Sequence, residues 1–322
     1  MKAVQYVSPG HVTVVDVPVP ERPAGEVLLR LDKVAICGSD LHMLYDSAPA
    51  SFPFAPGVSG HECIGVVEEA DSTEVRRGER MLIIPPKINA MAEYVTVEPK
   101  WLIPIPDGLD SQRGVLAQLL GTVLYACKRL PSVVDKTVAV VGQGPVGLFF
   151  TMLMAHYGAK KIIGLDVVDH RLSVSRAVGA AHTINAEREN PAEAVRELTD
   201  GALVDLVIEA VGKEETINYS LDLVRQNGDM LLFGIPKRSA FVFEYEKFLR
   251  KLLRTTSCAF TQQEPGLRSF RLAVDLIAQG RLDVSPLISH CLPLADAPGA
   301  FYLAQTKQDG AVKVLLDCWL DA

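Results

Sequence analysis

Two short clusters of polar residues near the start of the chain carry side chains suited to binding a transition metal. Cys37 opens a Cys-Gly-Ser-Asp-Leu-His segment that ends at His42 and follows an apolar stretch. His61 and Glu62 follow Gly60 just before another apolar stretch. Thiolate and imidazole are good zinc ligands, and a catalytic zinc site needs three protein ligands and one open position. Cys37 and His61 are therefore two candidate ligands of a catalytic zinc.

A glycine-rich turn is the second segment with a chemical signature. It has the spacing G-x-G-x-x-G and lies between an apolar run, residues 137–141, and a long apolar segment, residues 148–156. A strand, this turn and a helix together form the dinucleotide-binding fingerprint, in which the glycines allow a tight turn, close approach to the pyrophosphate and close packing. The helix N-terminus then faces the pyrophosphate. The predicted cofactor-binding residues of the turn are Gly142, Gly144, Pro145, Val146 and Gly147.

An acidic residue follows the turn at the distance that the fingerprint requires. Asp166 ends the next predicted strand, where a carboxylate accepts hydrogen bonds from the adenosine ribose and repels a 2′-phosphate. This favours NAD over NADP. Arg171 lies close by in the sequence, and we place it at the cofactor site too, where it either stacks on adenine or remains a solvated helix residue.

The order of these segments resembles that of the medium-chain dehydrogenase/reductase family. The resemblance covers nearly the whole chain, and within the family it is strongest to the zinc-dependent polyol and threonine dehydrogenase branch. The motifs that carry it, in chain order, are CGSDLH from Cys37, GHE from Gly60, RGER from Arg77, AEYV from Ala92, the glycine turn, HCLPL from His290 and the closing Val312, Lys313 and Val314.

The resemblance assigns roles to residues of the first two clusters. It implies that Cys37 and His61 are zinc ligands and that Glu62 is an acid that either ligates the zinc or acts from the second shell. It also implies a proton relay, in which Ser39 takes the proton of the substrate hydroxyl and His42 passes it to solvent. The structural alternatives are a buried thiol for Cys37, a hydrogen-bonded core imidazole for His61, and ordinary turn residues for Ser39 and His42.

Two positions depart from the family pattern. The third ligand in this branch is usually Glu or Cys in a segment resembling residues 117–121, where this chain has Gln118. Gln118 is a candidate ligand, but its neutral amide binds zinc more weakly than a carboxylate, and a helix-surface amide is the alternative. The four-cysteine structural zinc lobe would lie between Ile84 and Ala92, where only a short loop, residues 85–91, is present. We therefore expect one catalytic zinc and no structural zinc.

The elements that must hold these residues fall into two groups along the chain. In the first hundred residues, short strands are predicted at 12–15, 26–34, 64–68, 81–84 and 94–97. A connecting helix is predicted over 113–130, where apolar residues recur at helical spacing. Strands and helices then alternate, with strands predicted at 137–141, 161–166, 204–209 and 230–233. This alternation indicates a parallel sheet covered on both faces.

Capping signals and the family resemblance complete the predicted architecture. Asn190 and Pro191 are expected to begin a helix, whereas Gly201, Gly228 and Gly280 are expected to end helices. The fold class is α/β: a Rossmann doubly wound parallel sheet plus a mostly β, GroES-like catalytic domain. Residues 1–119 and 263–322 are assigned to the catalytic domain and residues 120–262 to the dinucleotide-binding domain.

The composition limits the possible partners of the chain. Its 322 residues include 32 basic and 39 acidic ones, and no stretch concentrates the basic residues, so neither nucleic acid nor a membrane is expected as a partner. The six cysteines contain no C-x-x-C pair, and the first residues do not resemble a secretory signal. We expect a cytoplasmic protein with a small-molecule alcohol or carbonyl substrate. The resemblance implies a homodimer or homotetramer joined edge to edge near residues 231–233.

The leading hypothesis is a zinc-dependent oxidoreductase that transfers a hydride between NAD and a secondary alcohol, polyol or sugar-like hydroxyl. One alternative is a zinc-free reductase of the same superfamily that reduces an enoyl or quinone substrate with NADPH; such members usually lack the pair formed by Cys37 and His61. The other alternative is a dinucleotide-binding protein that has lost catalysis, which only Gln118 favours.

Overall fold

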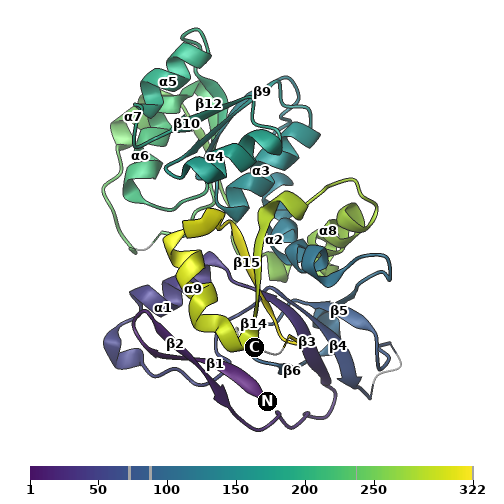
Figure 1. Cartoon of the computed structure of the whole chain (residues 1–322). Helices are drawn as coiled ribbons and strands as arrows, with labels where there is room; N and C mark the ends of the chain where they lie inside the picture. Colours follow the sequence, from purple (N-terminus) through teal and green to yellow (C-terminus); the bar gives the residue numbers. More distant parts are fainter. Residues whose placement is uncertain (72–73, 87–88, 237, 321–322) are drawn as a thin grey trace. The chain divides into compact units, whose positions relative to one another are not determined.

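The computed structural model describes residues 1–71, 74–86, 89–236 and 238–320. The chain divides into two compact units: Met1–Gly121 with Gln262–Ala322, and Thr122–Thr261. The first unit is built mainly of β-strands and the second of alternating strands and helices (Figure 1). The predicted α/β fold class, a doubly wound parallel sheet plus a mostly β domain, is confirmed.

The described residues of the first unit form strands and helices from both ends of the chain, together with most of a connecting helix. These are β1 (Lys2–Ser8), β2 (His11–Asp16), β3 (Val27–Ala35), α1 (Gly38–Asp46), β4 (Cys63–Glu69), β5 (Arg80–Ile83), β6 (Tyr94–Val97), β7 (Leu102–Pro104), α8 (Arg268–Ala278), β14 (Ile288–Pro293), α9 (Ala297–Thr306) and β15 (Lys313–Asp317). The connecting helix α2 (Ser111–Cys127) begins in this unit and continues into the next.

The main sheet of the first unit has the strand order β14-β15-β3-β4-β5-β7, and β6 also pairs with β3. Only β14 and β15 are parallel; the other pairs are antiparallel, as the short strands and turns of the sequence predict. The core of this unit is apolar and includes Tyr6, Leu29, Leu31, Met81 and Phe301. The strand β3 is buried along almost its whole length and is the backbone of the sheet.

In the described part of the second unit, strands alternate with helices. These are β8 (Thr137–Val141), α3 (Pro145–His156), β9 (Lys161–Asp166), α4 (Asp169–Ala177), β10 (His182–Asn185), α5 (Pro191–Leu198), β11 (Val204–Glu209), α6 (Glu214–Leu223), β12 (Val224–Leu232), α7 (Tyr245–Arg250) and β13 (Arg254–Ser257). The strands at 137–141, 161–166 and 204–209 begin and end at the predicted residues.

All six strands of the second unit are parallel, in the order β10-β9-β8-β11-β12-β13. The chain leaves β8 toward β9 and β10 and then returns to the other side of β8 with β11. The order therefore reverses between β8 and β11, and ligands of doubly wound sheets bind at such a switch point, beyond the carboxyl ends of the strands. Figure 1 shows α3 and α4 on one side of this sheet and α5 and α6 on the other.

Two predictions about the second unit are wrong. Gly228 does not end a helix: α6 ends at Leu223 and Gly228 lies inside β12, since the chain passes from helix to strand without a glycine cap. Residues 231–233 do not lie at a sheet edge either, because β12 is flanked by β11 and β13. By contrast, Asn190 caps α5 as predicted, its side chain accepting hydrogen bonds from the backbone of residues 192 and 193.

Among the described residues, no helix combines the length and the apolar composition that crossing a membrane requires.

Candidate metal and dinucleotide sites

The pairing of β3 with β4 explains why Cys37 and His61 meet. The two strands are antiparallel, with Val34 opposite Cys63, so the end of β3 and the start of β4 lie at the same end of the sheet. The backbone N–H of Ala35 donates to the carbonyl of Glu62 at 2.8 Å, which extends the pairing toward the two clusters. Residues just beyond the end of β3 and just before β4 are therefore held close together.

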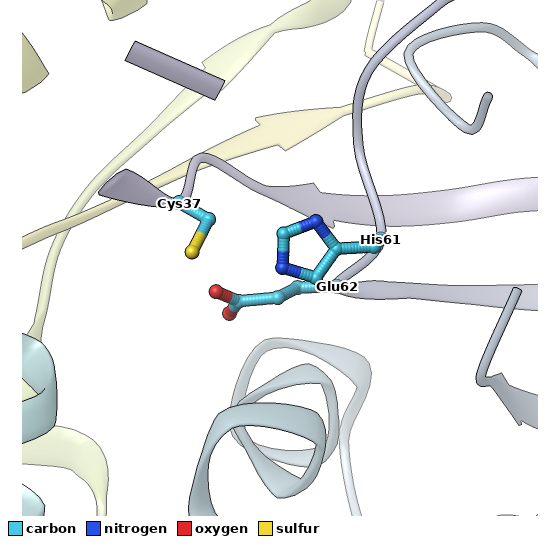
Figure 2. Close-up of side chains that lie close together, drawn as sticks. All are labelled: Cys37, His61 and Glu62. Carbon is cyan, nitrogen blue, oxygen red and sulfur yellow. The ribbon is translucent and has the colours of Figure 1, made fainter. Parts of the chain in front are cut away.

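The side chains of Cys37, His61 and Glu62 point toward a common centre (Figure 2). One ligand atom from each of them lies within 4.8 Å of the others, and no second group of this kind occurs in the described parts of the chain. A thiol sulfur, an imidazole nitrogen and a carboxylate oxygen form a donor set that zinc prefers. The sequence therefore predicted a set of residues that the fold does bring together.

The electrostatics of this group favour a cation. Burial lowers the pKa of His61, but the Cys37 thiolate, which its ring hydrogen-bonds, and the carboxylates of Asp40 and Glu62 outweigh burial and raise it to about 10. A field that favours a proton on the imidazole also favours a divalent cation bound in its place. The donor set and its field both fit a zinc ion, which Cys37, His61 and Glu62 would hold.

Glu62 forms a buried ion pair that the sequence did not predict. Lys313 Nζ, at the start of β15, lies 2.7 Å from each carboxylate oxygen of Glu62 and donates to the Ile36 carbonyl at 3.1 Å. Both side chains are almost completely inaccessible, with 2% and 0% of their surfaces exposed. Two charges are taken out of water here, so each depends on the other for compensation. Lys313 fixes the carboxylate of Glu62 beside the other two candidate ligands.

Asp40 is the second residue of the site to which the sequence assigned no role. Its buried carboxylate accepts a hydrogen bond from the backbone N–H of Cys37 at 2.8 Å, which caps helix α1. The same carboxylate accepts from the backbone N–H of Gly60 at 3.0 Å and from the hydroxyl of Ser59. One side chain thus ties the segment before α1 to the segment before β4, and so holds Cys37 and His61 at their observed separation.

Replacing Asp40 with alanine is expected to lower zinc affinity by about 10- to 100-fold, the range found when partners that orient metal ligands are removed. The reason is that Cys37 and His61 lose the carboxylate that links their segments. Competition with a chromogenic chelator measures the affinity. The matched control is Asp110→Ala, because Asp110 accepts a hydrogen bond from the backbone N–H of Arg113 in the first turn of α2. Equal zinc affinities in the two variants would contradict the role of Asp40.

The two predicted relay residues, Ser39 and His42, lie on helix α1, and no hydrogen bond between them is described. Ser39 Oγ is buried and has no hydrogen-bond partner among the described residues. His42 is 48% exposed, and its Nδ1 lies 2.7 Å from an oxygen of Asp46, one turn along the helix. Among the described residues, the hydroxyl of Ser39 is therefore free, and His42 has both solvent access and a carboxylate as its hydrogen-bond partner.

Gln118 lies on α2 and is buried, with 8% of its surface exposed. The alternative of a helix-surface amide is therefore wrong, while zinc ligation by Gln118 remains a prediction. The short loop of residues 85–91, where the sequence led us to expect no structural zinc, is described only in part, because Lys87 and Ile88 lie outside the described residues.

The glycine turn has the geometry that its sequence predicts. Gly142 has a φ of +89°, and a Cβ there would lie 2.5 Å from the Val211 side chain. A Cβ on Gly147 would lie 1.7 Å from the carbonyl oxygen of Gly142, so only glycine fits. Gly144 is the N-cap of α3, and Pro145 is its first residue. The N–H groups of the first turn of α3, beginning with Val146, are thus available to an anion at the helix N-terminus.

Asp166 ends β9 beside this turn. One of its oxygens accepts from the backbone N–H of Gln143 at 2.6 Å, and the other from Val167 and Val168 at 2.8 and 3.0 Å. The carboxylate therefore steadies the turn, and its remaining lone pairs can accept ribose hydroxyls. Arg171, on α4, lies beside Gly144: one guanidinium nitrogen is 3.5 Å from where a Cβ of that residue would be. Burial lowers the pKa of Arg171, and the charge of Asp166 opposes that effect.

A doubly wound parallel sheet with a dinucleotide turn, together with a thiol–imidazole–carboxylate group, defines a dinucleotide-dependent oxidoreductase of the zinc type. Family models agree with this class. Residues 23–107 match the alcohol dehydrogenase GroES-like domain, and residues 145–279 match the zinc-binding dehydrogenase model.

Individual relatives cover almost the whole chain. An alcohol dehydrogenase from Cupriavidus necator is 29% identical, over 98% of this chain and 98% of the relative. A sorbitol dehydrogenase from Gallus gallus is 27% identical, over 94% and 92%. The structure of the alcohol dehydrogenase TADH from Thermus sp. ATN1 superposes with a TM-score of 0.88 at 29% identity, over 98% and 99%. A Sinorhizobium meliloti 1021 protein described as a zinc-binding dehydrogenase, bound to NADP, gives a TM-score of 0.85 at 27% identity, over 98% of each chain.

The chain belongs to the zinc-type medium-chain dehydrogenase/reductase family. It is an NAD(P)-dependent oxidoreductase of the alcohol and polyol dehydrogenase class, and the hypothesis of a non-catalytic binding protein is therefore rejected.

Proposed function

We propose that this enzyme uses NAD and a single zinc ion to interconvert a secondary alcohol, polyol or sugar-like hydroxyl and the corresponding ketone. The observation that carries the proposal is the convergence of Cys37, His61 and Glu62 within 4.8 Å. A zinc-free reductase would have no use for a thiol, an imidazole and a carboxylate in this arrangement. The names of the relatives, which include alcohol and sorbitol dehydrogenases, support the choice of substrate class.

The chemistry divides between the metal and the side chains of the first unit. Zinc, when bound, acts as a Lewis acid on the substrate oxygen. The free hydroxyl of Ser39 accepts the proton of the substrate alcohol, and His42, which pairs with Asp46, transfers a proton to solvent. NAD, when bound, would supply the hydride acceptor, so that the alcohol would lose one proton to the relay and one hydride to the cofactor as the ketone forms.

A substrate screen with a metal assay on the same sample tests the proposal. Purified protein from zinc-supplemented cultures is assayed on secondary alcohols, polyols and sugars with NAD and NADP in parallel. We expect turnover with NAD and about one equivalent of zinc, as a single catalytic site requires. Zinc below about a tenth of an equivalent, combined with reduction of enoyl or quinone substrates by NADPH, would instead identify the zinc-free reductase of the same superfamily.

Ser39→Ala is expected to lower kcat by about 100-fold, because positioned proton transfer contributes at least that much to such reactions. Zinc content should not change, since Ser39 is not among the proposed ligands. The matched control is Ser47→Ala, at the other end of α1. A kcat unchanged by the Ser39 substitution would exclude this residue from the relay.

The preference for NAD rests on Asp166, whose carboxylate repels a 2′-phosphate. Asp166→Ser is expected to raise the ratio of kcat/KM for NADP to that for NAD by about tenfold or more. The substitution removes a charge-assisted hydrogen bond to the ribose of NAD, and such a bond contributes a free energy of this size. Asp169→Ser is the control, because Asp169 pairs with Arg188 and Asn185. An unchanged ratio of the two kcat/KM values would show that Asp166 does not bind the ribose.

We also propose that the two compact units are the catalytic domain (1–119 and 263–322) and the dinucleotide-binding domain (120–262). A homodimer or homotetramer is proposed to form through β13, which in the described part of the second unit has a strand on one side only. Light scattering on purified protein tests the assembly, and disruption by Thr256→Pro in β13 tests the edge.

A further inference from the structure

Glu209 carries a buried carboxylate that the proposed mechanism does not use. It ends β11, has 0% of its surface exposed and pairs with no lysine or arginine of the described ranges. Its Oε1 accepts hydrogen bonds from the backbone N–H groups of Val211 and Gly212, both at 2.9 Å, and from the Thr216 hydroxyl at 2.8 Å. Its Oε2 accepts from Gly212 at 3.1 Å. A buried charge is costly unless several donors satisfy it, and here they are two backbone N–H groups of one short turn and the hydroxyl of Thr216 in the first turn of α6.

The turn that Glu209 holds lies at the edge of the sheet where a dinucleotide binds. In the register of β8 and β11, Glu209 is opposite Val141, the last residue before the glycine turn. The N–H of Ala210 donates to the carbonyl of Val141 at 2.9 Å, and the Val211 side chain fills the space beside Gly142. Residues 210–212 and the glycine turn are therefore the neighbouring loops at the switch point between β8 and β11.

The two loops face different halves of the cofactor. Asp166, at the end of β9, is placed to bind the adenosine ribose, so the adenine half extends over β9. The nicotinamide half must then extend in the opposite direction, over the ends of β11 and β12. On that side Gly212 packs closely against Gly234 and Ile235: a Cβ on Gly212 would lie 2.4 Å from the Ile235 carbonyl oxygen. This leaves the 210–212 turn little freedom once Glu209 holds it.

We propose that Glu209 is a positioning residue for the nicotinamide half of the cofactor, acting through the turn of residues 210–212. The inference rests on the proposed use of NAD and extends it to a residue that does not itself touch the cofactor. Both oxygens of the carboxylate accept, whereas a glutamine that keeps its oxygen at the Oε1 position would turn its NH₂ group toward the N–H of Gly212. The turn would then move, and the nicotinamide ribose would lose its preformed support.

Glu209→Gln is tested by titration calorimetry with NAD and, separately, with AMP, which probes only the adenine half. The expected result is that the Kd for NAD rises about tenfold while the Kd for AMP changes less than about twofold, since the displaced loop serves only the nicotinamide half. The loss in kcat/KM for NAD should be larger than any loss in thermal stability would explain. Equal weakening of NAD and AMP would overturn the proposal in favour of a purely structural role.

Two further variants keep the test decisive. Thr216→Val removes one donor and leaves the carboxylate in place, so it should raise the Kd for NAD alone by about two- to threefold, the effect of a single net hydrogen bond. Asp205→Asn is the matched control at the opposite end of β11, where Asp205 accepts from the backbone of Thr137 and from Arg225. It should change stability without changing the ratio of the two affinities.

The unaltered chain separates the two hypotheses. If it fails to bind NAD, the proposed function is wrong, and the role of Glu209 falls with it. If it binds NAD, and Glu209→Gln and Thr216→Val bind NAD as tightly as it does, only the positioning role is overturned.

Discussion

Cys37→Ser is expected to leave less than about a tenth of an equivalent of zinc in the purified protein and to lower kcat/KM by about a thousandfold or more. A serine hydroxyl is not ionised at neutral pH and does not replace a thiolate as a zinc ligand. Without the metal, the several kcal/mol by which a Lewis acid stabilises the transition state are lost, and each 1.4 kcal/mol or so corresponds to a factor of ten. Elemental analysis and steady-state kinetics on the same preparation measure both effects.

Binding of the cofactor provides an internal check on this variant. Cys37 belongs to the first compact unit and the glycine turn to the second. The Kd for NAD should therefore change little in Cys37→Ser, which separates loss of metal from loss of fold. Cys291→Ser is the matched control, because Cys291 lies in the same unit, on β14, outside the metal-ligand group. Full zinc occupancy in Cys37→Ser would remove this residue from the ligand set.

Three strands of the second unit could be predicted from the sequence to the residue. Its strands β8, β9 and β11 are largely buried and mostly apolar, and Gly142 directly follows β8. The strand β12 was predicted too short, because its first half, Val224–Gly228, is polar and partly exposed. In the register, only Val224 of that half pairs with β11, and pairing with β13 begins at Asp229, so neither an apolar pattern nor continuous pairing marks it as a strand.

The candidate metal site was predictable only in part. The residue types and the order of the motifs predicted Cys37, His61 and Glu62 as candidate zinc ligands. The pairing of β3 with β4 explains why the three side chains converge. The partners of these residues depend on tertiary structure. Asp40 lies inside the CGSDLH motif, but its link to Gly60 requires the fold. Lys313 reaches Glu62 from 251 residues away, a pairing that spacing alone does not indicate.

The ion pair of Lys313 and Glu62 leads to the largest expected effect on stability. Lys313→Met should lower the free energy of unfolding of the metal-free protein by about 3 to 5 kcal/mol, because it leaves the carboxylate of Glu62 buried without a compensating charge. The double variant Lys313→Met with Glu62→Leu should recover most of that loss, since an apolar pair of similar volume removes the desolvation penalty. Urea unfolding in the presence of EDTA measures these differences.

Zinc should then stabilise Lys313→Met more than it stabilises the unaltered chain. With Lys313 gone, the charge of Glu62 can be compensated by the metal, so binding of zinc to the native state adds a larger increment to stability. Lys33→Met is the matched control, because Lys33 is also buried in the first unit and pairs with Asp32 at 2.5 Å and Asp317 at 2.9 Å, outside the metal-ligand group. It should lose stability as well, but zinc should stabilise it by the same increment as the unaltered chain. If zinc stabilises Lys313→Met and Lys33→Met equally, the Glu62 carboxylate does not interact with the metal, and only Cys37 and His61 of the converging group remain as ligands.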